Sequence, residues 1–319
     1  MQVRQVPRGT PLSILYFRFA ARSSDGAQRS PMLERLVARA GDPSRVEDWR
    51  TEAFRVIAPG AQRLPSIAAT IVPEVGSGAD PAAWACIATP VHLSAGMRSV
   101  TMAADGILNL APGEAAALSA DFNRVFGGAG VRLSVGREAL LSCLFDDRIE
   151  AVTRDPAEVA GNDVFGFQPS GPDGARLRRL MSEMEMWLFD HPVNHARAAQ
   201  ERQPVTGLWL WGGGPTGEAL PLVRGWCAGQ DPFFAAFGSE HEFPRAAGGG
   251  VVVCGEQPGS NEWREVERRW LVPAVAALRA GRLKRLDLSA ADRRFSIGKG
   301  LSLRFWRRPR PWWESYGIQ

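Results

Sequence analysis

The sequence of 319 residues has few of the side chains that build metal centres and disulfide frameworks. It contains four histidines and four cysteines, and no two cysteines form a CxxC pair. Cysteines spaced this widely are typical of reduced, buried thiols in the cytosol rather than of a zinc site or a disulfide framework. We therefore predict no bound metal and no other cofactor. The cysteines are Cys86, Cys143, Cys227 and Cys254.

Long hydrophobic runs are also missing. No run approaches the 18 apolar residues that a membrane-spanning helix needs, and the N-terminal stretch Leu12–Ala21 is broken by Arg18. No small-residue cleavage pattern follows a clear apolar segment, as a secretion signal would require. The sequence therefore predicts a cytoplasmic protein that does not associate with a membrane.

The composition is otherwise that of a folded protein rich in turns. Hydrophobic residues make up 45% and charged residues 23%, with 34 glycines and 23 prolines. Eleven tryptophans against two tyrosines indicate large core or interface side chains. A formal charge of +4 is mildly basic and does not by itself call for a nucleic acid partner.

Hydrophobic periodicity predicts an α/β fold with an α+β middle lobe. We expect an N-terminal α/β segment over 1–80, an inserted α+β lobe over 81–170, and a C-terminal α/β segment over 171–319 that completes the core. Strands are expected at 12–19, 85–93, 99–103, 131–135, 139–145, 149–152, around Trp209, at 251–254, and around Leu286, Ile297 and Leu303. Helices are expected at 31–40, 46–56, 112–126, 173–190, 192–199 and 261–280, the last interrupted by Pro273, with an irregular connection at 59–80.

The passage Thr206–Gly217 is the most informative in the chain. An apolar strand, Leu208–Trp211, runs directly into Gly212, Gly213 and Gly214. Bare backbone N–H groups in such a turn can bind a small anion. The competing interpretation is a tight turn that needs glycine for its backbone conformation.

A cluster of polar residues precedes this strand. If helix and strand pack together, Asn194, Arg197 and Arg202 converge on the loop Gly212–Thr216, and the set, including Thr216, can bind a phosphate or a carboxylate. Alternatively, Asn194 caps a short helix and Arg197 pairs with Glu201 one turn later. Both interpretations stay open, and the sequence predicts no catalytic residue.

The C-terminal stretch Lys299–Trp313 mixes cations with aromatic residues. Such interleaving can bind single-stranded nucleic acid. A final strand with one packed face and one basic face explains most of the pattern, and leaves a basic surface patch for an acidic partner. The patch is formed by Arg304, Arg307, Arg308 and Arg310.

Several passages resemble a known family. Leu110–Leu118, Glu183–Arg197 and Leu208–Gly214 resemble the archaeal type of cofactor-independent phosphoglycerate mutase. Together with Trp270–Pro273, Gly281–Leu286 and Leu303–Arg308, they resemble more closely the phosphoglycerate-mutase-like, RpfE-type regulatory proteins of proteobacteria. The resemblance implies a fold of the alkaline-phosphatase-like α/β class.

The enzyme's metal ligands are not found at the matching positions. The family implies two divalent ions, which an N-terminal Asp-Gly-x-x-Asp and a later Asp-x-x-Gly-His passage help to hold. Here no such motif follows the strand Leu12–Phe19, and no histidine follows Val251–Glu256. His191 and His195 are separated by Pro192, which opposes one continuous helix through both.

The sequence therefore predicts a non-catalytic, phosphoglycerate-mutase-like regulatory or binding protein. One alternative is a phosphoryl-transfer enzyme or phosphometabolite-binding protein with an altered site, and a second is a nucleic-acid-associated protein using the basic C-terminus. The partner is not identified by the sequence. A protein or a small phosphorylated metabolite is favoured over nucleic acid.

Overall fold

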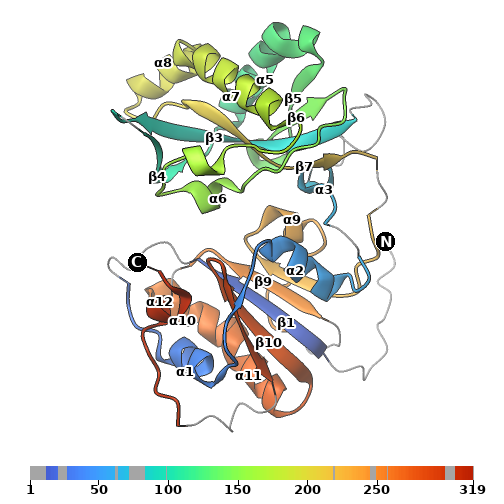
Figure 1. Cartoon of the computed structure of the whole chain (residues 1–319), viewed down its shortest axis with the longest axis vertical. Coiled ribbons are helices and arrows are strands. Elements are labelled where there is room, and N and C mark those ends of the chain that lie inside the picture. Colours follow the sequence, from blue (N-terminus) through green and yellow to red (C-terminus); the bar gives the residue numbers. More distant parts are fainter. Residues whose placement is uncertain are drawn as a thin grey trace. The chain divides into compact units, whose positions relative to one another are not determined.

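The computed structural model divides the chain into two compact units (Figure 1). Unit 1 joins Met1–Leu64 to Pro221–Gln319, and unit 2 is the continuous segment Pro65–Leu220. The structure describes residues 12–20, 27–61, 64–71, 83–97, 99–217, 220–244, 249–256, 258–298 and 306–318.

Unit 1 is built on a six-stranded sheet in the order β2-β11-β10-β1-β9-β8. The four strands β10, β1, β9 and β8 are parallel, whereas β11 and β2 continue the sheet in antiparallel fashion. The strands are β1 (Leu12–Phe19), β2 (Ser44–Arg45), β8 (Trp226–Gly229), β9 (Gly250–Cys254), β10 (Leu283–Ala290) and β11 (Arg293–Gly298).

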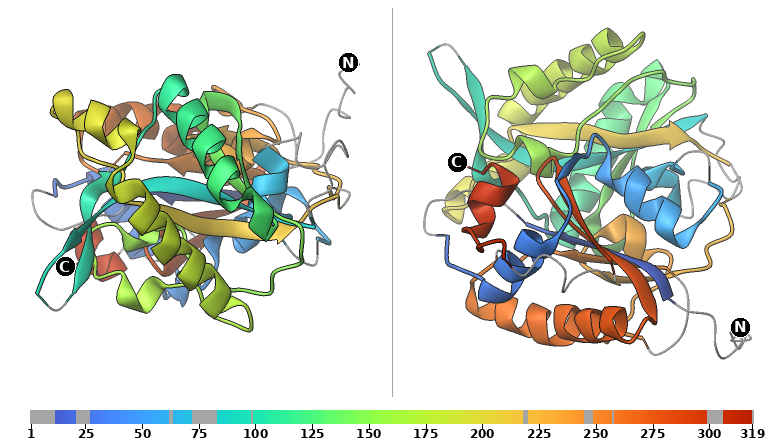
Figure 2. Two further views of the ribbon diagram at one scale, coloured as in Figure 1. Left: turned by 90° about the horizontal axis from the view of Figure 1, so that it is seen from above. Right: turned by 60° about the horizontal axis from the view of Figure 1, so that its bottom comes forward.

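Helices cover both faces of this sheet (Figures 1 and 2). Alternate residues of β1 point to opposite faces, so Leu15, Phe17 and Phe19 share one side, where they join a core that includes Trp263 and Trp312. That side is covered by α1, α10, α11 and α12, and the other by α2 and α9. The helices are α1 (Pro31–Arg39), α2 (Trp49–Ile57), α9 (Pro232–Ala235), α10 (Asn261–Val266), α11 (Val272–Arg279) and α12 (Trp312–Tyr316).

Side-chain caps begin α1 and α2, and Pro273 lies where α10 passes into α11. Ser30 caps α1, and the Asp48 carboxylate caps α2 by accepting the Thr51 N–H at 3.1 Å. A π-helical turn, Glu267–Leu271, joins α10 to α11. The N–H of Val272 bonds to the carbonyl of Glu267, which accommodates Pro273, a residue with no N–H of its own.

Unit 2 is an antiparallel sheet with helices packed on it. Its strands run in the order β4-β3-β6-β5, and β7 pairs with the other edge of β3. The strands are β3 (Trp84–Ala95), β4 (Val100–Ile107), β5 (Val131–Val135), β6 (Leu141–Phe145) and β7 (Gly207–Pro215). The α-helices are α3 (Ile67–Ile71), α5 (Pro112–Phe126), α6 (Pro156–Val159), α7 (Gly174–Phe189) and α8 (Pro192–Ala199), and short 3₁₀ turns occupy 127–129, 137–139 and 165–167.

The expected α/β class with an α+β lobe is confirmed, and most expected elements lie within two or three residues of their predicted bounds. The strand predicted at 149–152 is wrong, because Val152 makes only an isolated bridge to Ser170. The connection predicted as irregular contains α3. Residues 171–220, grouped with the C-terminal core in the sequence, lie in unit 2, where β7 pairs with β3. No helix in the described ranges is long and apolar enough to cross a bilayer.

Candidate functional site

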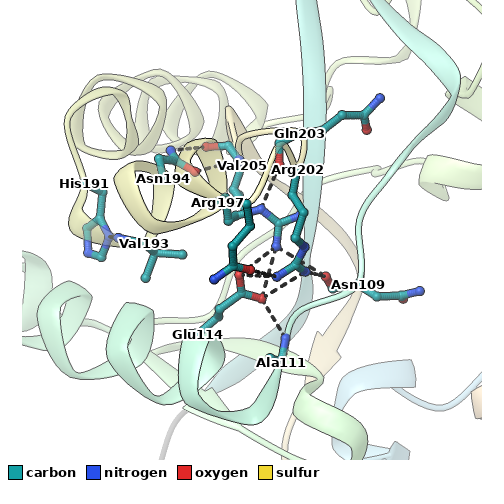
Figure 3. A network of polar contacts seen from close by, with 11 residues as sticks. Asn109, Ala111, Glu114, His191, Val193, Asn194, Arg197, Arg202, Gln203 and Val205 are labelled. Carbon is teal, nitrogen blue, oxygen red and sulfur yellow. Dashed lines mark hydrogen bonds and ion pairs between the residues drawn. The ribbon is translucent and has the colours of Figure 1, made fainter.

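An ion-pair cluster in unit 2 joins two of the residues singled out in the sequence (Figure 3). Arg197, whose side chain is 4% exposed, donates from Nη1 to both carboxylate oxygens of Glu114 at 3.0 and 3.1 Å. Arg202 reaches Glu114 Oε1 at 3.0 Å. Both guanidinium groups also lie 3.5 Å from the carbonyl oxygen of Asn109. Two cations therefore share one carboxylate.

Glu114 is held in place by the start of α5. Its carboxylate accepts the backbone N–H of Ala111 at 2.7 Å, as a glutamate in the third helical position of a capping box does. Burial alone would raise the pKa of Glu114, but the Ala111 N–H and the guanidinium groups of Arg197 and Arg202 outweigh it and lower the pKa. Glu114 was not singled out in the sequence as a site residue.

Asn194 binds backbone groups on both sides of α8. Its Nδ2 donates to the carbonyls of Leu188 at 2.7 Å and Val205 at 2.9 Å, and its Oδ1 accepts the Val205 N–H at 2.8 Å. The alternative that Asn194 caps the helix is wrong, since His191 caps α8 through Nδ1, which accepts the Val193 N–H. Arg197 pairs with Glu114 rather than with Glu201.

The three glycines lie at the far end of β7 from this cluster. At about 3.3 Å per residue, Gly213 lies roughly 20 Å along the strand from Gly207, and the cluster precedes that residue. A Cβ on Gly213 would lie 2.0 Å from the Trp84 ring. Gly214 faces Ser66, and Gly212, with φ of +64°, faces Ile67. The structure therefore does not bring the glycines and Thr216 together with Asn194, Arg197 and Arg202.

A second group of polar side chains lies where the parallel strands of unit 1 end, which is where ligands bind in open α/β sheets. The guanidinium groups of Arg18 and Arg50 lie 4.7 and 4.5 Å from the centre of the Trp49 ring. Arg50 also forms a buried ion pair with Asp231 at 2.8 Å. Asp231 lies two residues after the end of β8 and caps α9 by accepting the Phe234 N–H. This group was missed because nothing in the sequence connects residues so far apart.

Two other carboxylates described at this sheet edge also have partners. Glu256 accepts a hydrogen bond from Gln230 at 3.0 Å, and Asp292 lies 3.5 Å from Arg45. Across the described ranges, no three His, Cys, Asp or Glu side chains lie close enough to hold a metal ion. The described residues therefore do not fit the two-metal centre that the resemblance implies, which needs several such ligands together.

The histidines are distributed over separate places. His191 is buried beside Asp121, with 3.2 Å between Nε2 and Oδ2, and burial lowers its pKa more than Asp121 raises it. His195 is exposed and bonds to Asp190 at 2.7 Å. His92 Nδ1 lies 3.0 Å from the carbonyl of Pro204, and His241 is exposed.

All four cysteines are buried and free. Cys86 and Cys143 lie opposite each other on β3 and β6. Burial raises the pKa of Cys86 far above its usual value and that of Cys227 to about 12. The Cys86 and Cys227 thiols are therefore poor nucleophiles, because the thiolate is the reactive form.

The basic C-terminal residues lie in unit 1. Arg307, Arg308 and Arg310 are exposed, and Arg304 lies outside the described residues. The final strand was expected within 299–313. Its first part falls outside the described residues, and the remainder is a turn and an extended segment followed by α12.

Comparison with known proteins shows a distant sequence similarity to cofactor-independent phosphoglycerate mutases. No family model matches the chain. A probable 2,3-bisphosphoglycerate-independent phosphoglycerate mutase of Geobacter sulfurreducens is 31% identical over an alignment of 94 positions, which covers 24% of each chain. The second such enzyme of Methanothermobacter thermautotrophicus is 38% identical over 60 positions, covering 18% of this chain and 15% of the enzyme. The chain thus matches a quarter or less of these relatives' length.

Two solved structures align along most of the chain. One is the cofactor-independent phosphoglycerate mutase of Thermoplasma acidophilum, with 16% identity, a TM-score of 0.36, and coverage of 91% of this chain and 90% of the enzyme. The other is a Pyrococcus horikoshii protein, with 10% identity, a TM-score of 0.37, and coverage of 91% and 88%.

Proposed function

We propose that this protein is a non-catalytic, cytoplasmic regulatory or binding protein, related to phosphoglycerate mutases of the alkaline-phosphatase-like class and without their two-metal phosphotransfer site. The sequence similarity to those mutases supports the relationship. The four free thiols support a reducing compartment.

The main support for the proposal is the ion pair between Arg50 and Asp231. Asp231 lies at the carboxyl end of β8, where a carboxylate is placed to bind a metal or substrate. Its ion pair with Arg50 is almost fully buried. Recruiting Asp231 as a metal ligand would break this buried ion pair, and breaking such a pair costs about 3–5 kcal/mol. Arg18, on the same tryptophan ring, adds a further positive charge there.

The test is an assay of phosphoglycerate mutase activity with 3-phosphoglycerate and added Mn²⁺ or Mg²⁺, together with metal analysis of the purified protein. We expect no turnover above the rate without protein and no stoichiometric metal. Turnover that a chelator abolishes and added Mn²⁺ restores would refute the proposal. The Methanothermobacter relative, a 2,3-bisphosphoglycerate-independent phosphoglycerate mutase, serves as the positive control.

A phosphorylated metabolite is the second candidate, and one observation favours it. Arg197 and Arg202 share the single carboxylate of Glu114, which leaves one positive charge in excess, and the Arg202 side chain is 38% exposed. An accessible guanidinium can bind phosphate bidentately. Calorimetry with 3-phosphoglycerate should then give saturable heat that Arg202→Gln removes, whereas Arg179→Gln, at an exposed ion pair on α7, retains it. Absence of heat with the wild-type protein would exclude this candidate.

A further inference from the structure

The C-terminal segment lies beside α1 in unit 1 and runs along it in the opposite direction (Figures 1 and 2). Arg307 Nη1 donates to the carbonyl of Ala40, at the C-terminal end of α1, at 3.3 Å. Trp312 Nε1 donates to the carbonyl of Gln28, just before the helix, at 2.9 Å. Residues separated by more than 250 positions therefore form one surface.

Arginines from both segments line this surface. The arginine strip is formed by Arg29, Arg35, Arg39, Arg307, Arg308 and Arg310. Arg35 and Arg39 are one turn apart on α1, and Arg308 and Arg310 are exposed in the C-terminal segment. At about 1.5 Å per residue, the nine residues of α1 extend the strip over roughly 14 Å.

The strip carries an excess of positive charge. The acidic residues along it are Glu34, which pairs with Arg29 at 2.6 Å, Asp42, which lies 3.7 Å from Arg307, and the exposed Glu314. Among the described residues, these three carboxylates and Glu267, which accepts a hydrogen bond from Ser30 at 2.7 Å, accompany six guanidinium groups, so the net charge is about +2. Guanidinium groups match the geometry of phosphate oxygens better than ammonium groups do, and every cation of the strip is an arginine.

A hollow and an aromatic side chain adjoin the strip. A cavity of about 420 Å³ is lined by Arg29, Pro31, Glu34, Arg35 and Pro309. Its size lies in the range of small-ligand sites. The indole of Trp306, at the other end of the segment, is 65% exposed. Exposed indoles beside cations can stack on bases, which neither an acidic peptide nor a lipid headgroup offers.

We infer that the arginine strip binds single-stranded nucleic acid. The arginines contact successive phosphates, the hollow between Arg29 and Arg35 receives one nucleotide, and Trp306 stacks on an unpaired base. A duplex keeps its bases stacked on one another, so they are not available to stack on the exposed ring of Trp306. This inference does not depend on whether the protein has mutase activity.

The experiment measures fluorescence anisotropy of labelled oligo-dT and oligo-rU of 12 nucleotides with the full chain at several salt concentrations. With about four phosphates neutralised, we expect the logarithm of the affinity to fall with the logarithm of salt concentration with a slope near −3. The triple reversal Arg35→Glu, Arg308→Glu, Arg310→Glu should weaken binding at least tenfold. Trp306→Ala should weaken it about fivefold or more, as expected for loss of one stacked base.

The matched control reverses three exposed arginines elsewhere, Arg148→Glu, Arg279→Glu and Arg282→Glu, and should change the affinity less than threefold. Thermal unfolding of each variant establishes that it folds. The inference is overturned if the wild-type chain gives no saturable binding at 50 mM salt, or if the control loses as much affinity as the strip variant. It is also overturned if polyglutamate or a duplex competes as well as the single strand. Mutase assays use a different readout, so failure here leaves the proposed function untouched.

Discussion

At the scale of single residues, Arg197 joins three parts of unit 2. Its Nε donates to the Gln203 carbonyl at 2.7 Å, and its Nη1 binds Glu114 and lies near the Asn109 carbonyl. It thereby connects α8 to the start of α5 and to the segment that leads into β7. The same contact joins two passages that resemble phosphoglycerate mutases, since Glu114 belongs to one and Arg197 to the other.

Arg197→Gln should destabilise the protein by about 2–3 kcal/mol, because it leaves a half-neutralised Glu114 carboxylate and an unpaired carbonyl in a buried place. The measurement is the free energy of unfolding in urea. Arg202→Gln is the matched control and should cost less than about 1 kcal/mol, since that side chain is more exposed. Equal losses in the two variants would contradict this account.

His191 makes the stability of the protein depend on pH. Burial lowers its pKa in the folded state, and protonation would also place a hydrogen on the Nδ1 atom that accepts the Val193 N–H. The unfolded chain therefore binds this proton more readily. The contribution of His191 is complete above its unfolded pKa of about 6.5 and is lost as the pH falls below that value.

His191→Asn should reduce the loss of unfolding free energy between pH 7 and pH 5, because asparagine caps a helix without titrating. Urea unfolding at a series of pH values measures this. The control is His241→Asn, which changes an exposed histidine of unit 1 and should affect the pH profile less than His191→Asn does. A profile unchanged by His191→Asn would show that other groups cause the loss.

Pro112 and the apolar stripe that follows it predict the start of α5, so the position of Glu114 in the first turn was predictable. Its partner was not, because Arg197 is 83 residues away and only the packing of α8 against α5 brings them together. The contact between Arg18 and the Trp49 ring, on which Arg50 also lies, was not predictable for the same reason.

At the scale of elements, β7 explains why a strand carries three glycines. Gly213 lies against the ring of Trp84, which itself packs on Phe145 at 5.4 Å, so no side chain fits there. Gly212 adopts a positive φ and lies close to Ile67. Close packing and backbone conformation thus account for two of the glycines.

Gly213→Ala should destabilise the protein by about 1–3 kcal/mol, as expected for overpacking against a buried ring. The control is Gly128→Ala in the turn after α5, where no atom in the described part of the chain lies within 4 Å of an added Cβ. That variant should be neutral or slightly stabilising. A neutral Gly213→Ala variant would show that the strand can shift and that packing does not require the glycine.

Elements with strong periodicity and clear ends were predictable. The helix over 112–126 is confirmed because Pro112 starts it, an apolar stripe follows, and two glycines end it. The stretch Ile149–Val152 has the composition of a strand, but pairing with a distant residue decides whether a strand forms, and only Val152 finds such a pair.

At the scale of the whole molecule, unit 2 interrupts unit 1 in the sequence. Unit 2 is one continuous segment with its own sheet and helices, whereas the sheet of unit 1 needs strands from both sides of the interruption. The sequence predicted an inserted lobe but placed its end near 170. The extent of unit 2 could not be predicted, because β7 pairs with β3 only after α7 and α8, which follow the predicted end of the lobe.

The fragment Pro65–Leu220 should fold alone and unfold cooperatively in urea, whereas the fragment Met1–Leu64 should remain unfolded. Circular dichroism and backbone NMR spectra measure both outcomes. An unfolded 65–220 fragment would show that this unit depends on the rest of the chain.

The position of β1 has a consequence for synthesis of the protein. This strand is made long before its neighbours, yet it lies between β9 and β10, and Arg18 bonds to Ser289, which is 271 residues later. At about 5–20 residues per second, a ribosome takes on the order of tens of seconds to deliver those neighbours. During that time Leu15, Phe17 and Phe19 have no neighbouring strands to pair with and no core to join. Nascent chains whose synthesis stalls before β9 and β10 are made should therefore be captured by chaperones that recognise apolar segments.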